Sequence, residues 1–423
     1  MKRLLIALIL PCFLEAQSIS ELFEALKSHS QTKIDIVSVK KSKIQKGMVE
    51  SSLYPKIDVF ASYDNYNKAT GLIPIPPNKS LPMVKDASVG QPFSKNIYKA
   101  GAKFSMPIFV KSIYTAAKKA EAMQKSVEAK KYINLIKNEA IIISQNANFS
   151  YLVSLKKSLQ IKEKSLLETR KTIKIKVENG RLSESSLYKI EDAINEISIA
   201  KNNIELQEKR VISSIQSITG ITLKKPVDME QIDSFEVTSM DSLKPLEKKV
   251  EANSIDLKVQ KEKLYPSVVA HGSYVFSKAK AYNNDKSVNE NYSDIGLVIN
   301  IPLVDMNRYS SISMAKVILQ SSMVELEKQR DELEAESKML KESLQLQENS
   351  IKLYKKSIEN KKKLLEIAKV NFTTGRLATE EYLRYEDAVV AQKANLFKIE
   401  AQKWQTIMSL AVIYGNNIEE MVR

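Results

Sequence analysis

The sequence predicts a mainly α-helical protein in which one structural unit, a pair of strands followed by a long helical hairpin, occurs twice. The first observation behind this prediction is an internal repeat at a constant offset of 195 positions. Its landmarks include Pro107 and Pro302, Gly180 and Gly375, and Gly220 and Gly415. The second observation is that residues 110–179 and 305–374 contain neither Pro nor Gly. A repeat without net insertion suits helices that must reach the same distance, because helix length follows from residue count.

The composition is typical of long, solvated helices. The chain has 423 residues with only 10 Gly and 12 Pro, and 27% of its residues are charged. Its formal net charge of +15 would also suit a nucleic acid or a membrane surface. However, the Lys residues alternate with Glu, Ser and Gln, and no compact basic run is interleaved with aromatic residues. We therefore interpret the charge as solvated helix faces and expect no nucleic-acid partner.

Residues 1–16 have the features of a secretory signal peptide: a short positive region followed by an apolar stretch too short to span a bilayer. Ala16 favours cleavage before Gln17, but the small residue expected two positions earlier is missing, so the exact site stays open. The only cysteine, Cys12, could carry a lipid, although Pro11 precedes it where a small residue is expected. No later stretch has 18 consecutive apolar residues, so we expect an exported protein without an inner-membrane helix.

The first structural repeat covers residues 17–220. A segment from residue 19 to about 52 has an apolar face and predicts a helix, with Ser20 as its N-cap. Residues 53–109 predict a strand pair, and residues 110–220 predict a helical hairpin.

Residues 221–241 contain Pro226 and several acidic residues and predict a connector. The second structural repeat, residues 242–423, follows the same order. It predicts a helix at 243–264, a strand pair at 264–304 and a helical hairpin at 305–415.

The strand pairs are predicted from alternation with period two. Apolar and polar residues alternate at 57–63 and 100–106 in the first copy and again at 295–301 in the second, as in strands with two different environments. The loop at 71–93 is rich in turn residues. The two strand pairs differ by 16 residues, all between the strands, and such insertions collect in exposed loops.

Each long helix should span roughly 100 Å, at 1.5 Å per residue. The second one carries a heptad-like apolar stripe, which predicts coiled-coil packing against a neighbour. The stripe consists of Leu319, Met323, Leu326, Leu333, Leu340, Leu344, Ile351, Tyr354, Ile358, Leu365, Ala368 and Phe372. Each long helix should end at a Gly, and a second helix should then return antiparallel to it.

The residues that catalysis or metal binding would need are missing. His29 and His271 lie far apart without a Cys partner, and no phosphate-binding loop or dinucleotide fingerprint is present. The paired acids Glu191-Asp192 and Glu386-Asp387 occur at the same point of two helices, which indicates solvated or inter-helix ion pairs. Trp404, the only tryptophan, is expected to pack. We expect no enzyme, no metal and no cofactor.

In the order and spacing of these features the chain resembles the TolC family of outer-membrane efflux proteins. The resemblance covers nearly all of the chain after the signal peptide. The motifs that carry it are Leu53-Tyr54-Pro55 and Leu264-Tyr265-Pro266 at the strand starts, Pro107 and Pro302 at the strand-to-helix junctions, Gly180-Arg181-Leu182 and Gly375-Arg376-Leu377 at the helical turns, and Gln216-Ser217-Ile218-Thr219-Gly220 at a helix end.

The resemblance implies a mainly α protein with membrane β-strands. It implies a homotrimer whose subunits give four strands each to a twelve-stranded outer-membrane β-barrel, which a long periplasmic α-helical barrel continues. Four strands alone would leave unpaired edges in lipid, so closure requires several subunits. The alternation of the strands fits one face toward lipid and one toward water.

The resemblance also implies a function: a passive exit duct of a tripartite efflux pump or a type I secretion system. Its partners would be a periplasmic adaptor (membrane fusion) protein, an inner-membrane transporter of the RND, ABC or MFS type, and outer-membrane lipid. The cargo stays open between small molecules, such as drugs and toxic compounds, and proteins. The alternative is a periplasmic coiled-coil adaptor or scaffold protein, which usually has one hairpin rather than two.

By matching positions, the resemblance places a periplasmic gate and adaptor contact at the two helical turns, residues 177–187 and 372–384. The candidate residues are Gly180, Arg181, Leu182, Ser186, Phe372, Gly375, Arg376, Leu377, Glu381 and Arg384. Phe372 matches an aromatic gating position and Glu381 an acid that faces the pore. Arg384 and Ser186 stand where acids are often found. We hypothesise that Glu381 and Arg384 pair across or between subunits and hold the turns shut.

Overall fold

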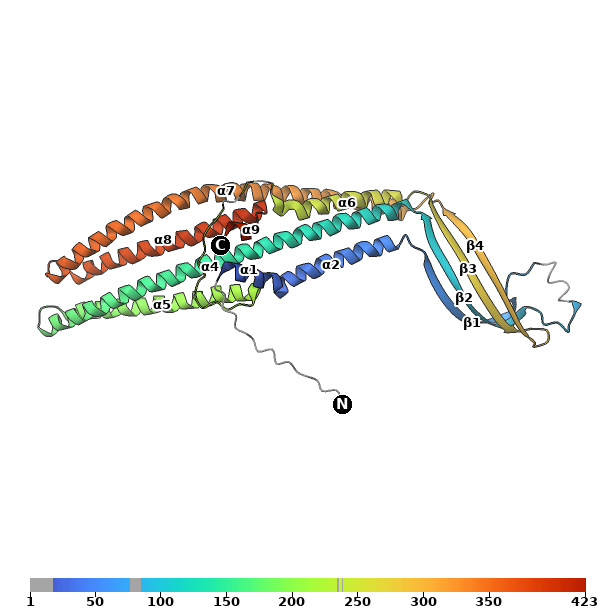
Figure 1. Ribbon diagram of the computed structural model, residues 1–423, viewed down its shortest axis with the longest axis horizontal. Coiled ribbons are helices and arrows are strands. Elements are labelled where there is room, and N and C mark those ends of the chain that lie inside the picture. Colours follow the sequence, from blue (N-terminus) through green and yellow to red (C-terminus); the bar gives the residue numbers. More distant parts are fainter. Residues whose placement is uncertain (1–17, 77–84, 234–235, 238) are drawn as a thin grey trace, which may run out of the picture. The chain divides into compact units, whose positions relative to one another are not determined.

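The computed structural model describes residues 18–76, 85–233, 236–237 and 239–423. The predicted signal peptide, including Cys12, lies outside these residues. The chain divides into two compact units (Figure 1). The first comprises Met1–Val39, Val127–Pro245 and Glu327–Arg423, and the second comprises Lys40–Ser126 and Leu246–Leu326.

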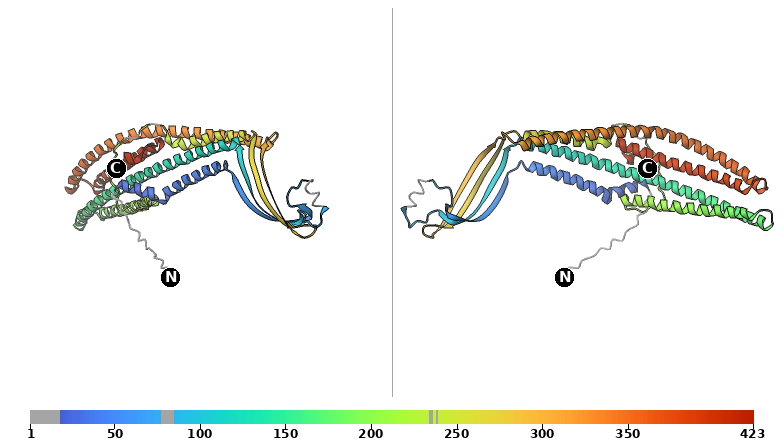
Figure 2. Two further views of the ribbon diagram at one scale, coloured as in Figure 1. Left: turned by 45° about the vertical axis from the view of Figure 1, so that its right-hand side comes forward. Right: turned by 180° about the vertical axis from the view of Figure 1, so that it is seen from behind.

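The second unit contains a four-stranded antiparallel sheet with the order β1-β2-β3-β4 (Figure 2). The strands are β1 (Lys56–Gly71), β2 (Phe93–Phe109), β3 (Ser267–Lys280) and β4 (Ser287–Asn300). They therefore lie where the alternating patterns predict them, and both strand pairs join one sheet. Within the described residues, β1 pairs only with β2 and β4 only with β3, so each has one open edge.

The register sorts the sheet into two faces, because directly paired residues share a face. The first, called here the apolar face, carries Ile57, Val59, Tyr63, Tyr98, Ala102, Phe104, Met106, Val268, Ala270, Tyr274, Ile295, Leu297 and Ile299. The second, called here the polar face, carries Lys56, Asp58, Asp64, Lys99, Lys103, Ser105, His271, Ser273, Glu290 and Asp294.

Each ladder of the sheet pairs an aromatic ring with a glycine. These pairs are Phe60 with Gly101, Phe104 with Gly272, and His271 with Gly296. At Gly272 an added Cβ atom would lie 2.9 Å from the backbone oxygen of Asp294 and would also collide with the ring of Phe104. The glycines therefore provide the space over which the neighbouring rings lie.

Two helical hairpins follow the strand pairs. The first consists of α4 (Lys111–Glu178) and α5 (Glu184–Thr219), and the second of α7 (Met306–Thr373) and α8 (Thr379–Tyr414). Both long helices have 68 residues and both return helices have 36, and every bound in the second hairpin lies 195 positions after its counterpart. The prediction of two long helices, each ended close to a Gly, is confirmed.

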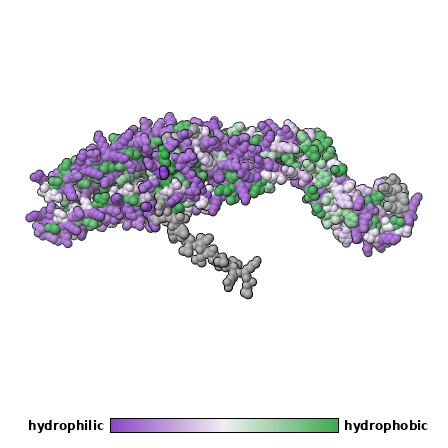
Figure 3. Space-filling model, in the orientation of Figure 1, coloured by the Kyte–Doolittle hydropathy of each residue, from purple (hydrophilic) through white to green (hydrophobic). Residues whose placement is uncertain are grey.

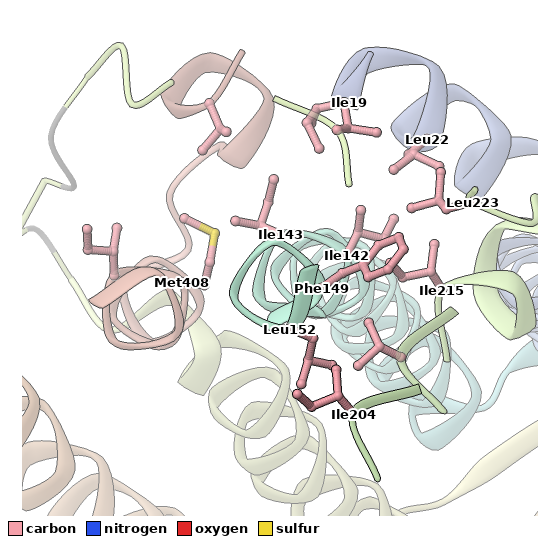
Figure 4. Close-up of a cluster of buried hydrophobic side chains, with 14 of the residues drawn as sticks. Ile19, Leu22, Ile142, Ile143, Phe149, Leu152, Ile204, Ile215, Leu223 and Met408 are labelled. Atoms are coloured by element: carbon pink, nitrogen blue, oxygen red, sulfur yellow. The ribbon is translucent and has the colours of Figure 1, made fainter. Parts of the chain in front are cut away.

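The core of the first unit lies where α1 (Ile19–Ser28) meets the hairpins. Figure 4 shows Ile19 and Leu22 of α1 near Ile143 and Phe149 of α4 and Met408 of α8. All of these side chains are at most 2% exposed. This cluster holds together segments that are far apart in the sequence.

The predicted stripe on α7 is confirmed over part of its length. Leu333, Leu340 and Leu344 pack against a buried cluster that includes Leu410 of α8. Met323, in contrast, is 50% exposed within one chain, so its packing against a neighbour stays a prediction.

The first predicted helix differs in two ways from the structure. Its N-cap is Ser18 rather than Ser20, because the Ser18 Oγ atom accepts a hydrogen bond of 3.3 Å from the backbone N–H of Glu21. The helix is also interrupted at His29, which separates α1 from α2 (Ser30–Ser51). The buried hydroxyl of Thr32 donates to the carbonyl oxygen of Leu26 at 2.7 Å, which satisfies a backbone acceptor at the interruption.

The described residues between α5 and a short 3₁₀ helix, η1 (Asp241–Leu243), belong to no helix or strand, and α6 (Lys244–Glu262) follows η1. The fully buried amide of Asn146 bonds both the backbone N–H and the carbonyl oxygen of Val227, at 2.9 and 2.7 Å. The backbones of Glu230 and Arg423, which follows α9 (Ile418–Met421), form a pair of hydrogen bonds of 2.8 and 3.0 Å. The segment is thus fastened to α4 of the first hairpin and to the residue that follows α9.

Candidate functional site

The two helical turns share one backbone conformation. Gly180 and Gly375 have φ angles of 66° and 78°, in the left-handed region that glycine adopts without steric cost. The N–H of Gly180 donates to the carbonyl of Val177, and the N–H of Arg181 donates to that of Lys176. Gly375 and Arg376 repeat this pattern, which is the Schellman motif that ends α-helices.

The residues that follow each glycine have different roles. The side chains of Arg181 and Arg376 are exposed at the turns. Leu182 and Leu377 are partly buried and pack back onto the core of the first unit. The Gly-Arg-Leu sequence therefore reverses the chain, exposes one cation and anchors the turn by one leucine.

The predicted gating aromatic, Phe372, is buried between the hairpins and only 7% exposed. Its ring stacks on that of Tyr382, with 4.7 Å between centroids and 14° between planes. The Nζ atom of Lys176, at the end of α4, lies 5.5 Å from the same ring. Within one chain, Phe372 therefore joins the first hairpin to the second.

An ionic group also joins the two hairpins beside this stack. The Nζ atom of Lys189 on α5 lies 3.1 Å from Glu380 on α8, and Arg384 lies 3.3 Å from the same carboxylate. The hydrogen bond from Lys189 is the largest cause that lowers the pKa of Glu380 below its ordinary value. Glu380 is therefore the shared anion of a cross-hairpin group, called here the Glu380 cluster.

Within one chain, Arg384 has a different partner from the Glu381 that the sequence suggested. Arg384 pairs with Glu380 one helical turn before it, in the favourable orientation with the acid first. Glu381 is exposed and forms no ion pair among the described residues. Ser186 is half-buried near the start of α5, and its backbone N–H donates to the carbonyl of Ser183. A pairing of Glu381 between subunits remains a proposal.

A buried carboxylate lies one turn further along α8. Glu386 is 5% exposed and accepts hydrogen bonds from Tyr382 at 2.9 Å and from Ser165 of α4 at 2.5 Å. Its other oxygen, Oε2, is buried without a partner among the described residues. Burial raises the pKa of Tyr382 to about 12, so its hydroxyl remains a donor at neutral pH. Lys162 of α4 forms an ion pair with the neighbouring Asp387.

The paired acids of the first copy form an ion pair within the hairpin, because Glu191 lies 2.6 Å from Arg170 of α4. The expectation of inter-helix pairs is therefore confirmed for Glu191 and Asp387. Trp404 is half-buried against the core of the first unit, and it lines a cavity of about 550 Å³ between α4, α7 and α8. Within the described residues, no group of three or more His, Cys, Asp and Glu side chains could hold a metal ion.

The sheet presents the second surface of functional interest. On its apolar face, large side chains are exposed, including Val59 at 84% and Ile295 at 83%. Exposed apolar area of this extent indicates a surface that contacts something other than water. Among the described residues, no helix is both long enough and apolar enough to cross a membrane.

Comparisons with known proteins found no matching family model and no matching curated protein. Solved structures do match. CmeC of Campylobacter jejuni, an outer membrane channel, has a TM-score of 0.79 at 16% identity, over 94% of this chain and 85% of CmeC. VceC of Vibrio cholerae, an outer membrane protein, has a TM-score of 0.77 at 12% identity, over 94% and 96% of the two chains.

The open state of the MtrE outer membrane channel of Neisseria gonorrhoeae matches with a TM-score of 0.75 at 12% identity, over 94% of this chain and 89% of MtrE. These proteins belong to the TolC family. The chain has a TolC-like fold.

The TolC-like fold brings the predicted turn residues Gly180 and Gly375 into equivalent positions of two equivalent hairpins. Glu380 and Tyr382, which contact the first hairpin or the buried Phe372, lie in the predicted range 372–384 but were not among the candidate residues, and Lys189 lies outside both predicted ranges. One signal was available, because Glu380 and Arg384 have the spacing and order of a stabilising helical ion pair. No sequence signal indicated Lys189, which lies 191 positions from Glu380.

Proposed function

We propose that the chain is one subunit of a trimeric outer-membrane exit duct, through which an inner-membrane transporter delivers its cargo. The observation that carries this proposal is the sheet. It has an exposed apolar face, an opposite polar face and two open edges, on a chain with a TolC-like fold. In lipid such edges must be paired, so several subunits have to close one barrel.

The apolar face suits the hydrocarbon of a bilayer and the polar face suits a water-filled lumen. The polar face holds both signs of charge, and Asp64 and Lys99 pair across β1 and β2 at 3.2 Å. A lumen lined in this way offers no single-sign barrier to cargo. This supports passive passage of small toxic compounds or proteins, with the choice made by the transporter.

The helices support assembly as well. Met339, Leu346, Leu353 and Ile367 lie on α7 at multiples of seven positions, and all four are exposed. Such a stripe is typical of a coiled-coil seam, and in water it favours burial against another helix. We assign it to the contact with a neighbouring subunit in a periplasmic helical barrel.

The gate is proposed at the two helical turns, where a periplasmic adaptor would also bind. The Glu380 cluster and the stack of Phe372 on Tyr382 hold the second hairpin against the first. An adaptor that competes for these contacts would release the second hairpin. Arg181 and Arg376 are exposed at the turns and are available to such a partner.

The test is the native mass of the protein extracted from the outer-membrane fraction in mild detergent. We expect a species of three chains that stays in this fraction during a salt wash. A monomer or dimer that salt releases without detergent would contradict the proposal. In that case the sheet would be a soluble hairpin pair, and the chain would be a periplasmic scaffold.

A further inference from the structure

The apolar face of the sheet changes in character along the strands. At the end near the helices it carries aliphatic side chains such as Val59 and Leu297. Further along, Tyr63 and Tyr98 are directly paired on the same face, and each is more than half exposed. Figure 3 shows the same change on the sheet, from green near the helices to white and purple toward the loops.

One lysine lies level with these tyrosines and a second lies beyond them, toward the loops. Lys278 is paired directly with Tyr98, so their side chains share the apolar face, and Lys280 is two positions further on. Both lysines are exposed, and neither forms an ion pair among the described residues. Their partners on β4, Asn289 and Ser287, carry no charge.

A cavity of about 510 Å³ lies beside these lysines. It is lined by Tyr63, Ser94, Lys95, Asn96, Tyr98, Lys280, Ala281, Tyr282 and Asp285. The rings of Tyr63 and Tyr98 are 4.9 Å apart, and the Tyr63 hydroxyl donates to the side-chain oxygen of Asn96 at 2.9 Å. The Nζ atom of Lys95 lies 5.8 Å from the centre of the Tyr282 ring. The cavity thus combines aromatic walls with two ammonium groups.

The acids of the sheet lie on the opposite face. Asp64, Glu290 and Asp294 all belong to the polar face by register. Among the residues named above as the lining of the cavity, only Asp285, in the turn between β3 and β4, has a carboxylate. The loop end of the apolar face is therefore cationic, although the strands themselves carry both signs.

From this arrangement we infer a binding site for the phosphate groups of a membrane lipid at the loop end of the apolar face, formed by Lys278, Lys280 and Lys95 beside the tyrosines. The inference rests on the proposed function, because it requires the apolar face to lie in lipid. Tyrosine rings lie at the level of lipid headgroups, and the ammonium groups beyond them would meet the phosphates. Ammonium groups and phosphate oxygens form charge-assisted hydrogen bonds.

A lipid accounts for the patch better than a protein partner does. On β1 and β2 the apolar surface runs from Val59 and Ala102 to the exposed rings of Tyr63 and Tyr98, and the cations adjoin these rings, as an apolar-to-charged gradient of a leaflet requires. Lys278 and Lys280 lie on β3, an inner strand of the sheet, and pairing at the open edges of β1 and β4 adds strands beside the sheet rather than over its faces. Pairing of the sheet edges between subunits would therefore leave this patch uncovered.

The test uses the full chain in mild detergent and native mass spectrometry, with lipid A carrying two phosphates as the probe. Each Lys near a charged lipid surface contributes about 1 kcal/mol, or about fivefold in affinity. We therefore expect the double variant Lys278→Gln with Lys280→Gln to bind the lipid about 25-fold more weakly. The matched control is Lys56→Gln with Lys103→Gln, which removes two lysines from the polar face and should bind like wild type.

Three further arms decide the source and the chemistry. The double variant Lys278→Arg with Lys280→Arg keeps both charges and should bind lipid A as tightly as wild type does. Lipid A without its phosphates should bind wild type weakly. Its affinity should equal that of intact lipid A for the double glutamine variant. Inorganic phosphate at the same concentration should not compete. Equal binding by wild type and the glutamine variant would overturn the inference, as would full competition by inorganic phosphate.

A polypeptide that co-purifies with wild type but not with the glutamine variant, while lipid binding is unchanged, would assign the patch to a protein and also overturn the inference. The trimer mass and the outer-membrane fraction are read separately for every variant. A trimer with unchanged lipid binding refutes this inference alone, whereas a wild-type protein without trimer or membrane association refutes the proposed function.

Discussion

The Nζ atom of Lys189 on α5 lies 3.1 Å from the carboxylate of Glu380 on α8, so an ion pair joins the two helical hairpins. Glu380 also accepts from Arg384 on its own helix. Both partners of the cross-hairpin pair are about half exposed, and such pairs contribute roughly 0.2–1 kcal/mol. The contact is therefore weak enough for a binding partner or for salt to break.

Substitution Glu380→Gln should make opening of the duct easier. It removes the anion that Lys189 and Arg384 share, and the expected rise in open probability is at most about fivefold, given the modest energy of an exposed pair. The measurement is single-channel conductance of reconstituted protein in a planar bilayer. High salt should reduce the difference between wild type and variant, because it screens the same pair.

Glu381→Gln is the matched control, because Glu381 is the adjacent exposed acid and has no ion pair among the described residues. If Glu381→Gln opened the duct and Glu380→Gln did not, pairing between subunits through Glu381 would replace the Glu380 cluster as the lock.

Tyr382→Phe should loosen the second turn. The variant keeps the stack on Phe372 but removes the hydroxyl that donates to the buried carboxylate of Glu386. Loss of a hydrogen bond to a buried acceptor costs about 1–3 kcal/mol. Hydrogen exchange of the backbone amides at 372–386 should become faster by the factor to which this loss of free energy corresponds. Tyr385→Phe is the control, since its hydroxyl has no bond among the described residues, and equal exchange in both variants would refute the role of Tyr382.

The stability of the first unit should fall as the pH rises toward 8, because of Glu139. This side chain is 3% exposed, and burial is the largest cause that raises its pKa to about 8; Glu419 raises it further, and Lys27 lowers it. The unfolded chain loses the proton near its ordinary pKa of 4.5, whereas the folded chain keeps it to about pH 8. The stabilisation by protonated Glu139 is therefore complete below the unfolded pKa and is lost progressively between these values.

Glu139→Gln should remove this dependence and raise stability at pH 8 by a few kcal/mol, on the order of 1.4 for each unit of pKa shift. The measurement is the unfolding temperature of wild type and variant between about pH 3 and pH 9, at roughly one-unit steps that bracket both pKa values. Parallel curves would show that Glu139 is already ionised in the folded protein. Glu381→Gln, which removes an exposed acid of the same unit without an ion pair among the described residues, should leave the slope unchanged.

Gly375→Ala should destabilise the second turn through its backbone alone. An added Cβ would meet no atom within 4 Å, but the φ of 78° disfavours any L side chain by about 1–2 kcal/mol. Gly47→Ala on α2 is the matched control, because this site is equally open but helical. There alanine should stabilise by about 0.5–1 kcal/mol. Equal changes in unfolding temperature would contradict the role of the positive φ.

The sequence alone predicted the elements that local patterns determine. Helix length follows from an uninterrupted run, so the two hairpins were predicted close to their observed bounds. Alternation with period two located the strands, and Gly180 marked the first turn because its conformation is a local property. The open edges and two-faced sheet follow from the same alternation once the register is known.

Contacts between segments that are distant in the chain could not be predicted from the sequence. The interruption at His29 is stabilised by the bond of Thr32 to Leu26, and nothing in the local pattern separates this segment from a continuous helix. The burial of Phe372 depends on Tyr382 and on Lys176 of the other hairpin. The choice of Glu380 over Glu381 as partner depends on which side of α8 faces α5, which the spacing of charges alone does not fix.

The open edges of β1 and β4 have a consequence for inheritance. In the proposed ring, every subunit provides one edge to each of its two neighbours, so one subunit with a broken β4 edge leaves the whole ring unclosed. A cell that makes normal and edge-defective chains together would lose most of its working ducts. Edge mutations should therefore be dominant, whereas mutations that prevent a chain from folding at all should be recessive.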